Sequence, residues 1–409
     1  MCHNIRKDEE QRRQKMGKYD FDTVRDRRGT CSLKYDTGPE IVGWQDLLPM
    51  WVADMDFALP GEVLDELHKR TDHGIFGYTM PDDRYAETLE GWFLRHYGWK
   101  PDRNWNTVVP GVVYGITLAV RSMAEPGEAV MIQEPVYYPF RGLVESNGRK
   151  AVNSPLLEKN GRYVMDLADF ESKIIGEDVR AFILCSPHNP VGRVWTREEL
   201  EEVLSICRKH NVKIIADEIH CDIIYPGNSF VSVANLAGGL SEDTVLCTSP
   251  SKTFNIAGLQ ISNILIPDPE LRKAFRREHD KNGVALSSAL GLTAAEAAYR
   301  LGDRWLSELL DYLQGNLDYF REFIKKEIPC LRLVEPEGTY LVWVDCSGLT
   351  DDSEKLYSFM KEEAGLWLDD GGIFGRNGEL FERFNIACPR SVLKQALNQL
   401  KEAVDRMGD

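Results

Sequence analysis

Five short runs of apolar residues, none of which alternates with polar residues, limit the folds that this chain can adopt. A strand that faces water on one side alternates apolar and polar residues, whereas a strand buried on both faces stays apolar along its length. The runs are AVMIQ (129–133), RAFILCS (180–186), VKIIADE (212–218), TVLCTS (244–249) and SNILI (262–266). They predict buried strands of a mainly parallel sheet.

Helix-like segments separate several of these runs. The segment TREELEEVLSICRKHN begins with Thr196 as a candidate N-cap, and Glu199 follows three residues later. This spacing is the signature of a capping box, which marks the start of a helix. The alternation of strands and helices predicts an α/β fold with a large, doubly wound domain.

The pattern changes after residue 290. A long amphipathic helix is expected from about Asp303 to Ile328, followed by the strand-like LRLVEP and TYLVWVD and by a last helix in SVLKQALNQLKEAVDRM. These elements predict a smaller α+β domain. We therefore expect a mobile N-terminal arm (1–18), a segment that joins the small domain (19–59), a large domain (60–290) and a small C-terminal domain (291–409).

The charge balance excludes several classes of partner. With 49 basic and 65 acidic residues, the formal net charge is −16, which disfavours binding to nucleic acid and to anionic membranes. Polar residues interrupt every apolar run, so no transmembrane helix is expected, and the N-terminus lacks the apolar core of a signal peptide. The nine cysteines include no C-x-x-C pair, which is typical of reduced cytoplasmic thiols and argues against a disulfide framework or a metal site.

Polar side chains follow four of the buried runs at the point where each run ends. In open α/β sheets, ligands bind beyond the carboxyl ends of the strands, so these side chains are expected to lie along one rim. They are Tyr137, Asn189, Asp217, His220 and Lys252. An aromatic ring, an amide, a carboxylate, an imidazole and an amine together suit a polar, planar ligand, and pyridoxal 5'-phosphate (PLP) in particular.

Each of four side chains matches one requirement of PLP. Lys252 offers the amine that forms a Schiff base with the cofactor aldehyde. Asp217 can hold the proton of the pyridine nitrogen, which makes the ring an electron sink. Asn189 can donate to the ring hydroxyl, and Tyr137 can stack on the ring.

The phosphate of PLP needs backbone N–H groups at a helix N-terminus. The sequence GVVYG at 111–115 opens a predicted helix, so Val112 and Val113 are candidates to present these groups, and Ser249 is a candidate hydroxyl donor. Taken alone, each of these features has an ordinary structural explanation: a solvated loop lysine, a helix-capping aspartate, a turn or core packing. The combination favours the cofactor, because several roles of one ligand fall on successive strand ends.

Longer motifs carry a resemblance to a known family. SPHNPVG, ADEIH and SPSKTFNIAGLQ, in this order, resemble the fold-type I PLP enzymes of the class I/II aminotransferase family. LPMWVADMDF, FGYT, PVYYPF and DEIHCD are similar to the MalY/PatB-type carbon–sulfur β-lyases within it. The resemblance covers about residue 20 to the end of the chain. It implies that Lys252, Asp217, Asn189 and Tyr137 bind PLP and that His220 lies near the ring hydroxyl.

The resemblance also implies residues that the strand ends do not reveal. Tyr78 of FGYT would reach the phosphate bound by a neighbouring subunit, which implies a homodimer. Arg383, together with Asn189, would bind the α-carboxylate of an amino-acid substrate. One position departs from many aminotransferases: Gln260 stands eight residues after Lys252, where they carry a phosphate-binding arginine. This departure disfavours a plain aminotransferase and fits the lyase branch.

The resemblance therefore implies a PLP-dependent carbon–sulfur β-lyase that converts cystathionine- or cysteine-type substrates into a thiol, pyruvate and ammonia. Lys252, released from the cofactor, would remove the α-proton. Tyr138 is a candidate proton donor to the departing sulfur, with packing as its alternative role. Two other functions stay open: an aminotransferase that uses the same lysine and cofactor, and a PLP-binding regulatory protein.

Overall fold

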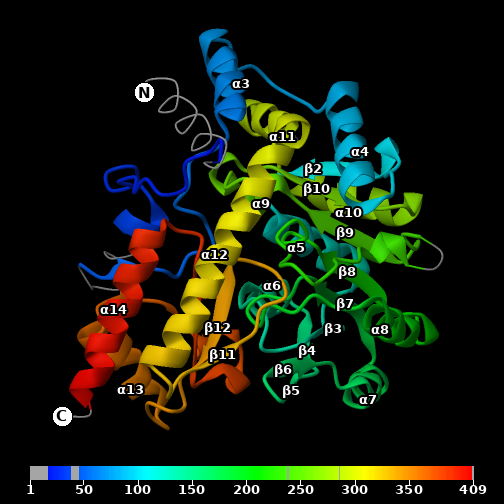
Figure 1. The fold of residues 1–409 in the computed structure, drawn as a ribbon. Helices are drawn as coiled ribbons and strands as arrows, with labels where there is room; N and C mark the ends of the chain where they lie inside the picture. The colour runs from blue at the N-terminus through cyan, green and yellow to red at the C-terminus, as the bar shows by residue number, and fades with distance from the viewer. Residues whose placement is uncertain (1–16, 38–45, 237–238, 285, 408–409) are drawn as a thin grey trace.

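The computed structural model describes residues 17–37, 46–236, 239–284 and 286–407. Its centre is a seven-stranded sheet in the order β2-β10-β9-β8-β7-β3-β4 (Figure 1). The strands are β2 (Asn106–Val109), β3 (Ala129–Ile132), β4 (Lys150–Asn153), β7 (Val179–Cys185), β8 (Lys213–Asp217), β9 (Thr244–Thr248) and β10 (Ser262–Leu265). Strand β10 is antiparallel to both of its neighbours, and the other described pairs are parallel. The five apolar runs are thus confirmed as strands of a mainly parallel sheet.

Both faces of this sheet are covered, which explains why its strands are apolar throughout. In β8, Ile214 and Ala216 point into one core while Ile215 points into the other. One face carries α5 (Val112–Met123), α6 (Pro139–Ser146) and α10 (Pro269–Lys281). The opposite core includes residues of α4 (Asp83–Tyr97), α7 (Leu167–Glu177), α8 (Arg197–Lys209) and α11 (Ala289–Leu301). The predicted capping box at Thr196 and Glu199 forms at the start of α8.

The smaller sheet lies beside the large domain and has four strands (Figure 1). They are β11 (Arg332–Val334), β12 (Leu341–Asp345), β15 (Phe381–Asn385) and β14 (Asp369–Asp370), all antiparallel. The helices of this region are α12 (Asp303–Glu327), α13 (Ser353–Ser358) and α14 (Arg390–Met407). The expected long helix from Asp303 is therefore present, and it packs against α14.

The N-terminal segment joins the two parts of the molecule. Strand β1 (Leu48–Pro49) pairs in parallel with β13 (Leu366–Trp367), and α3 (Gly61–Asp72) then packs against α11. Most of the predicted mobile arm, residues 1–16, lies outside the described residues. The predicted domain limits stay a prediction; since α11 packs on α3 and α4, we favour a limit near the α11–α12 junction over one at residue 290. No helix in the described ranges has both the length and the apolar character needed to cross a bilayer.

Candidate active site

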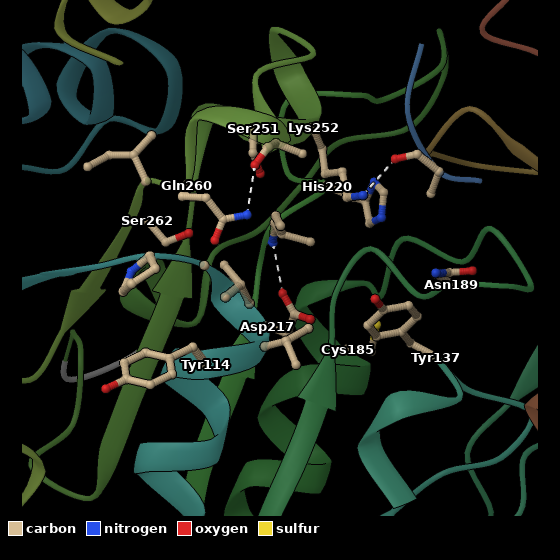
Figure 2. A pocket seen from close by; sticks show the side chains of 18 residues that line it. Tyr114, Tyr137, Cys185, Asn189, Asp217, His220, Ser251, Lys252, Gln260 and Ser262 are labelled. Atoms are coloured by element: carbon tan, nitrogen blue, oxygen red, sulfur yellow. Dashed lines mark hydrogen bonds between the residues drawn. The ribbon is translucent and has the colours of Figure 1, made fainter. Parts of the chain in front are cut away.

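A cavity of about 540 Å³ opens beyond the carboxyl ends of the central strands. Figure 2 shows its side chains gathered around one space. Of the residues predicted from the sequence, it is lined by Val112, Val113, Tyr137, Asn189, Asp217, His220 and Lys252. The structure therefore brings together the five strand-end residues and the helix start that the sequence analysis singled out.

Lys252 lies on α9 (Pro250–Thr253), a single helical turn that directly follows β9. Its Nζ donates a hydrogen bond to the carbonyl oxygen of Ala53 at 2.6 Å (Figure 2). Burial is the main cause that lowers the pKa of Lys252 to about 8; the charge of Arg383 acts in the same direction, while Asp54 and Asp217 act in the opposite one. At pH 7 about a tenth of the amine is then neutral, far more than for an ordinary lysine, and the neutral amine is the form that a nucleophilic lysine requires.

Asp217 ends β8 at the floor of the cavity and is 4% exposed. Burial raises the pKa of its carboxyl group to about 7, although the N–H of Ile219, which donates to Oδ1 at 3.1 Å, and the charge of Lys252 both lower it. A positive charge placed beside this carboxylate would restore its ionised form. The protonated ring nitrogen of PLP is such a charge, so the residue fits the cofactor.

His220 and Asn189 line the same cavity. Burial, with the positive charges of Lys252 and Arg383, holds the pKa of His220 well below its usual range, so the ring is neutral. Its Nδ1 is buried and has no hydrogen-bond partner within the described part of the chain. Because a buried polar atom without a partner is costly, this nitrogen points to a ligand group such as a hydroxyl.

The first turn of α5 forms another wall of the cavity. The helix begins at Val112, and its N-cap Gly111 offers no side-chain cap. The first N–H groups of a helix have no intrahelical acceptor, so those of Val112, Val113 and Tyr114 are available to an anion. Tyr114 was not singled out from the sequence, because only the helix start itself gives a signal.

Ser249, a predicted phosphate donor, makes hydrogen bonds within the chain. Its hydroxyl donates to the carbonyl of Ile261 at 2.7 Å and accepts from the N–H of Ser251 at 3.0 Å, so it caps α9 and does not line the cavity. Two other serines line it instead, Ser251 and Ser262. The Oγ of Ser262 is buried without a hydrogen-bond partner among the described residues. These two hydroxyls are further candidate phosphate donors, and the predicted role of Ser249 stays a prediction.

Tyr138 lies next to the cavity but not in its wall. It lines a neighbouring cavity of about 600 Å³ together with Phe374, whose ring centroid is 5.8 Å from its own. The side chain of Tyr138 is 43% exposed. The neighbouring Tyr137, by contrast, lines both cavities. The structure thus leaves both proposed roles of Tyr138, proton donor and packing, as predictions.

Arg383 lies in β15 and is 2% exposed. Its guanidinium donates to Asn189 Oδ1 at 2.9 Å and to the carbonyl of Trp51 at 2.9 Å, and it forms an ion pair with Asp369. Its Nε is buried without a partner among the described residues. A buried guanidinium with a spare donor suits a carboxylate ligand. Asp369 was not predicted, since its pairing with Arg383 arises from the register of β14 and β15.

Two further predicted residues sit at the rim of the site or outside it. Gln260 lines the cavity, and its Nε2 donates to the carbonyl of Ala257 at 3.4 Å. Tyr78 lies between α3 and α4, is 96% exposed and does not line the cavity of its own chain. A role for Tyr78 at a PLP site therefore needs a second subunit.

Comparisons with known proteins agree with this geometry. The family model "Aminotransferase class I and II" matches residues 46–400. The chain is 41% identical over 384 residues to cystathionine beta-lyase PatB of Bacillus subtilis, covering 94% of this chain and 99% of PatB. It is 33% identical over 388 residues to protein MalY of Escherichia coli, covering 94% of this chain and 99% of MalY.

The fold comparison gives the same answer. The structure of a PLP-bound C-S lyase from Staphylococcus hominis superposes with a TM-score of 0.88 at 34% identity, covering 94% of this chain and 98% of that one. The predicted fold-type I architecture is thereby confirmed. The chain belongs to the class I and II aminotransferase family of PLP-dependent enzymes.

Proposed function

We propose that this protein is a PLP-dependent carbon–sulfur β-lyase that splits cystathionine- or cysteine-type amino acids into a thiol, pyruvate and ammonia. The observation that carries this proposal is the 41% identity to a cystathionine β-lyase over nearly the full length of both chains. The cavity supports it, because it combines a lysine of lowered pKa with a buried carboxylate and a nearby arginine.

When bound, PLP supplies an electron sink that stabilises negative charge at the α-carbon of the substrate. Asp217 would hold the proton of the ring nitrogen, and Tyr137 would stack on the ring. Asn189 and the neutral His220 would face the ring hydroxyl. The first-turn N–H groups of α5, with Ser251 and Ser262, would hold the phosphate, and the uncharged Gln260 would not neutralise it.

Arg383 and Asn189 orient the substrate by its α-carboxylate. Lys252 then takes the α-proton, since its lowered pKa of about 8 gives it a much larger neutral fraction near physiological pH than an ordinary lysine has. The carbon–sulfur bond breaks with its electron pair staying on sulfur, and a proton from Tyr138 or from the lysine completes the thiol. Hydrolysis of the remaining three-carbon fragment gives pyruvate and ammonia.

We propose further that two copies of the chain share their sites. The segment that carries Tyr78 also exposes Ile75, Phe76 and Met80, which are 66%, 55% and 68% exposed. A second subunit that covers these apolar side chains would bring Tyr78 to its phosphate site. The eight cysteines that the structure describes are free thiols, which supports a cytoplasmic location.

An aminotransferase is the second candidate, because the matching family model carries that name and the reaction uses the same lysine and cofactor. A PLP-binding regulatory protein is the third, and it would not need Lys252, Asp217 and Arg383 together.

The deciding experiment is product analysis with cystathionine, with and without 2-oxoglutarate. We expect pyruvate, ammonia and free thiol in equal amounts without any keto acid. Turnover that strictly requires the keto acid and releases no thiol would identify an aminotransferase instead. Binding of PLP without turnover of any amino acid would favour the regulatory protein.

A further inference from the structure

Residues 51–57, WVADMDF, form a strap that contacts both cations of the proposed site through backbone carbonyls. Trp51 accepts from the guanidinium of Arg383 at 2.9 Å. Two residues later, Ala53 accepts from Lys252 Nζ at 2.6 Å (Figure 2). Arg383 belongs to the small domain and Lys252 to the large one, so the strap bridges the two parts of the site.

An asparagine on the small domain holds the first half of the strap. The Nδ2 of Asn385 donates to the carbonyls of Val52 and Asp54, both at 2.6 Å. Its Oδ1 accepts from the N–H of Ala387 at 2.8 Å, which fixes the side chain. Asn385 stands two residues after Arg383 on the same strand, β15.

A second asparagine, on the large domain, holds the other half. Asn255 Oδ1 accepts from the N–H of Met55 at 2.9 Å, and Nδ2 donates to the carbonyls of Met55 at 2.8 Å and Phe57 at 3.1 Å. Asn255 stands three residues after Lys252 and directly follows α9 and its C-cap. Each of these two asparagines, which we call the clamps, is therefore close in sequence to one of the two cations.

Ion pairs of its two aspartates also hold the strap. Arg27 pairs with Asp54 and with Asp56, and the buried Lys34 pairs with Asp56 at 2.8 Å. Tyr340 adds a hydrogen bond to the carbonyl of Ala53 at 3.0 Å. This many partners for so short a segment of irregular backbone indicate a fixed conformation.

We propose that Asn255 and Asn385 are positioning residues that act through this strap: they set the place of Lys252 relative to Arg383, and so the place of the α-carbon relative to the amine. The inference rests on the proposed function only in assigning a substrate carboxylate to Arg383, and it holds for elimination and transamination alike. The competing explanation is that each asparagine only stabilises its own domain.

A double-mutant cycle separates the two explanations. If both side chains act on one strap, Asn255→Ala and Asn385→Ala should each lower kcat/KM about 100-fold. That is the loss expected when Lys252 moves by roughly 1 Å relative to Arg383. The double variant then stays near about 100-fold, because the strap is already lost, whereas independent effects would multiply to about 10,000-fold. If Asn385→Ala does not fold, Asn385→Ser shortens the reach in the same way; at Asn255, whose φ is +55°, Asn255→Gly removes the side chain without adding backbone strain.

Asn316→Ala is the matched control. The buried Asn316 also donates from Nδ2 to two carbonyls, those of Ile386 at 2.8 Å and Cys388 at 2.9 Å, but it does not touch the strap. We expect this variant to lose stability while its kcat/KM falls far less than in the Asn255 and Asn385 variants, because Asn316 reaches the strap only indirectly, through Ala387, whose carbonyl accepts from the N–H of Asp56 at 2.9 Å. A loss equal to that of the clamp variants would overturn the proposal.

A spectroscopic readout needs neither cofactor nor substrate. Trp51 of the strap stacks on Trp367 with ring centroids 4.4 Å apart and planes at 12°. Stacked indoles give an exciton signal in circular dichroism, which Trp367→Phe identifies by removing it. We expect Asn385→Ala to lose this signal in the cofactor-free protein and Asn316→Ala to keep it.

The two readouts together decide the matter. A signal that persists in Asn385→Ala, with multiplicative kinetic effects, would overturn the positioning role. Failure of the proposed lyase activity would leave the exciton signal readable, so the two proposals fail separately.

Discussion

Replacing Lys252 with Met should stabilise the cofactor-free protein at pH 7. Burial lowers the pKa of Lys252 from its usual value of 10.5 to about 8, so the folded state binds this proton less tightly than the unfolded state. At ~1.4 kcal/mol per pKa unit, the charged amine costs the folded protein about 3 kcal/mol. Methionine matches the length of the side chain and carries no charge, so the variant avoids this cost.

The change of this stability difference with pH provides a second test. Below pH 8 the lysine is protonated in both states and the full cost is present, whereas above pH 10.5 it is neutral in both and the cost is absent. The advantage of the variant should therefore shrink as pH rises through this window. Tyr340 still donates to the carbonyl of Ala53, so the substitution leaves that oxygen with a partner.

Urea unfolding of the cofactor-free wild type and variant at pH 7 and at pH 10.5 measures both effects. Lys273→Met on the exposed side of α10 is the control for a change of charge without burial. A variant that is no more stable than the wild type at pH 7, or an advantage that is equal at both pH values, would refute the reasoning.

Three further predictions concern the working site. Asp217→Asn should keep PLP bound but slow the exchange of the substrate α-proton with deuterium, because an amide cannot hold the ring-nitrogen proton by a charge-assisted bond; near-normal exchange would contradict this role. Arg383→Ala should lower kcat/KM for amino acids by the ~2–5 kcal/mol that a lost buried charge pair costs, with an unchanged PLP spectrum; equal use of an amino acid and its amide by the wild type would disprove the contact. Mixing inactive Tyr78→Ala with inactive Lys252→Ala, after unfolding and refolding together, should restore part of the activity, because one site of the mixed dimer is then complete; no recovery would argue against shared sites.

The shifts at Lys252 and Asp217 have one cause and point to one kind of ligand. Burial moves the pKa of the lysine down and that of the aspartate up, so it disfavours the charged form of both groups. A ligand with a positive ring nitrogen reverses the shift at Asp217. The unpartnered Nδ1 of His220 and Oγ of Ser262 indicate where its polar groups would lie.

The sequence by itself determined the elements that depend on chain order. The unbroken apolar runs identified the buried strands, since a strand covered on both faces has no solvent side on which polar residues are tolerated. Residues that directly follow parallel strands must meet at one edge of the sheet, so Asn189, Asp217 and Lys252 could be grouped before any coordinates. The start of α5 at Val112 was likewise predicted from the sequence, and with it a candidate phosphate site.

The tertiary structure decided which atoms face the cavity. Ser249 and Ser251 are two residues apart, and only the capping of α9 turns one hydroxyl inward to the helix and leaves the other at the cavity wall. The carbonyls of Trp51 and Ala53 accept from Arg383 and Lys252. Because every residue has the same backbone carbonyl, the sequence cannot predict these contacts. The ion pair of Arg383 with Asp369 depends on the register of two strands, which is set by long-range packing and by no local pattern.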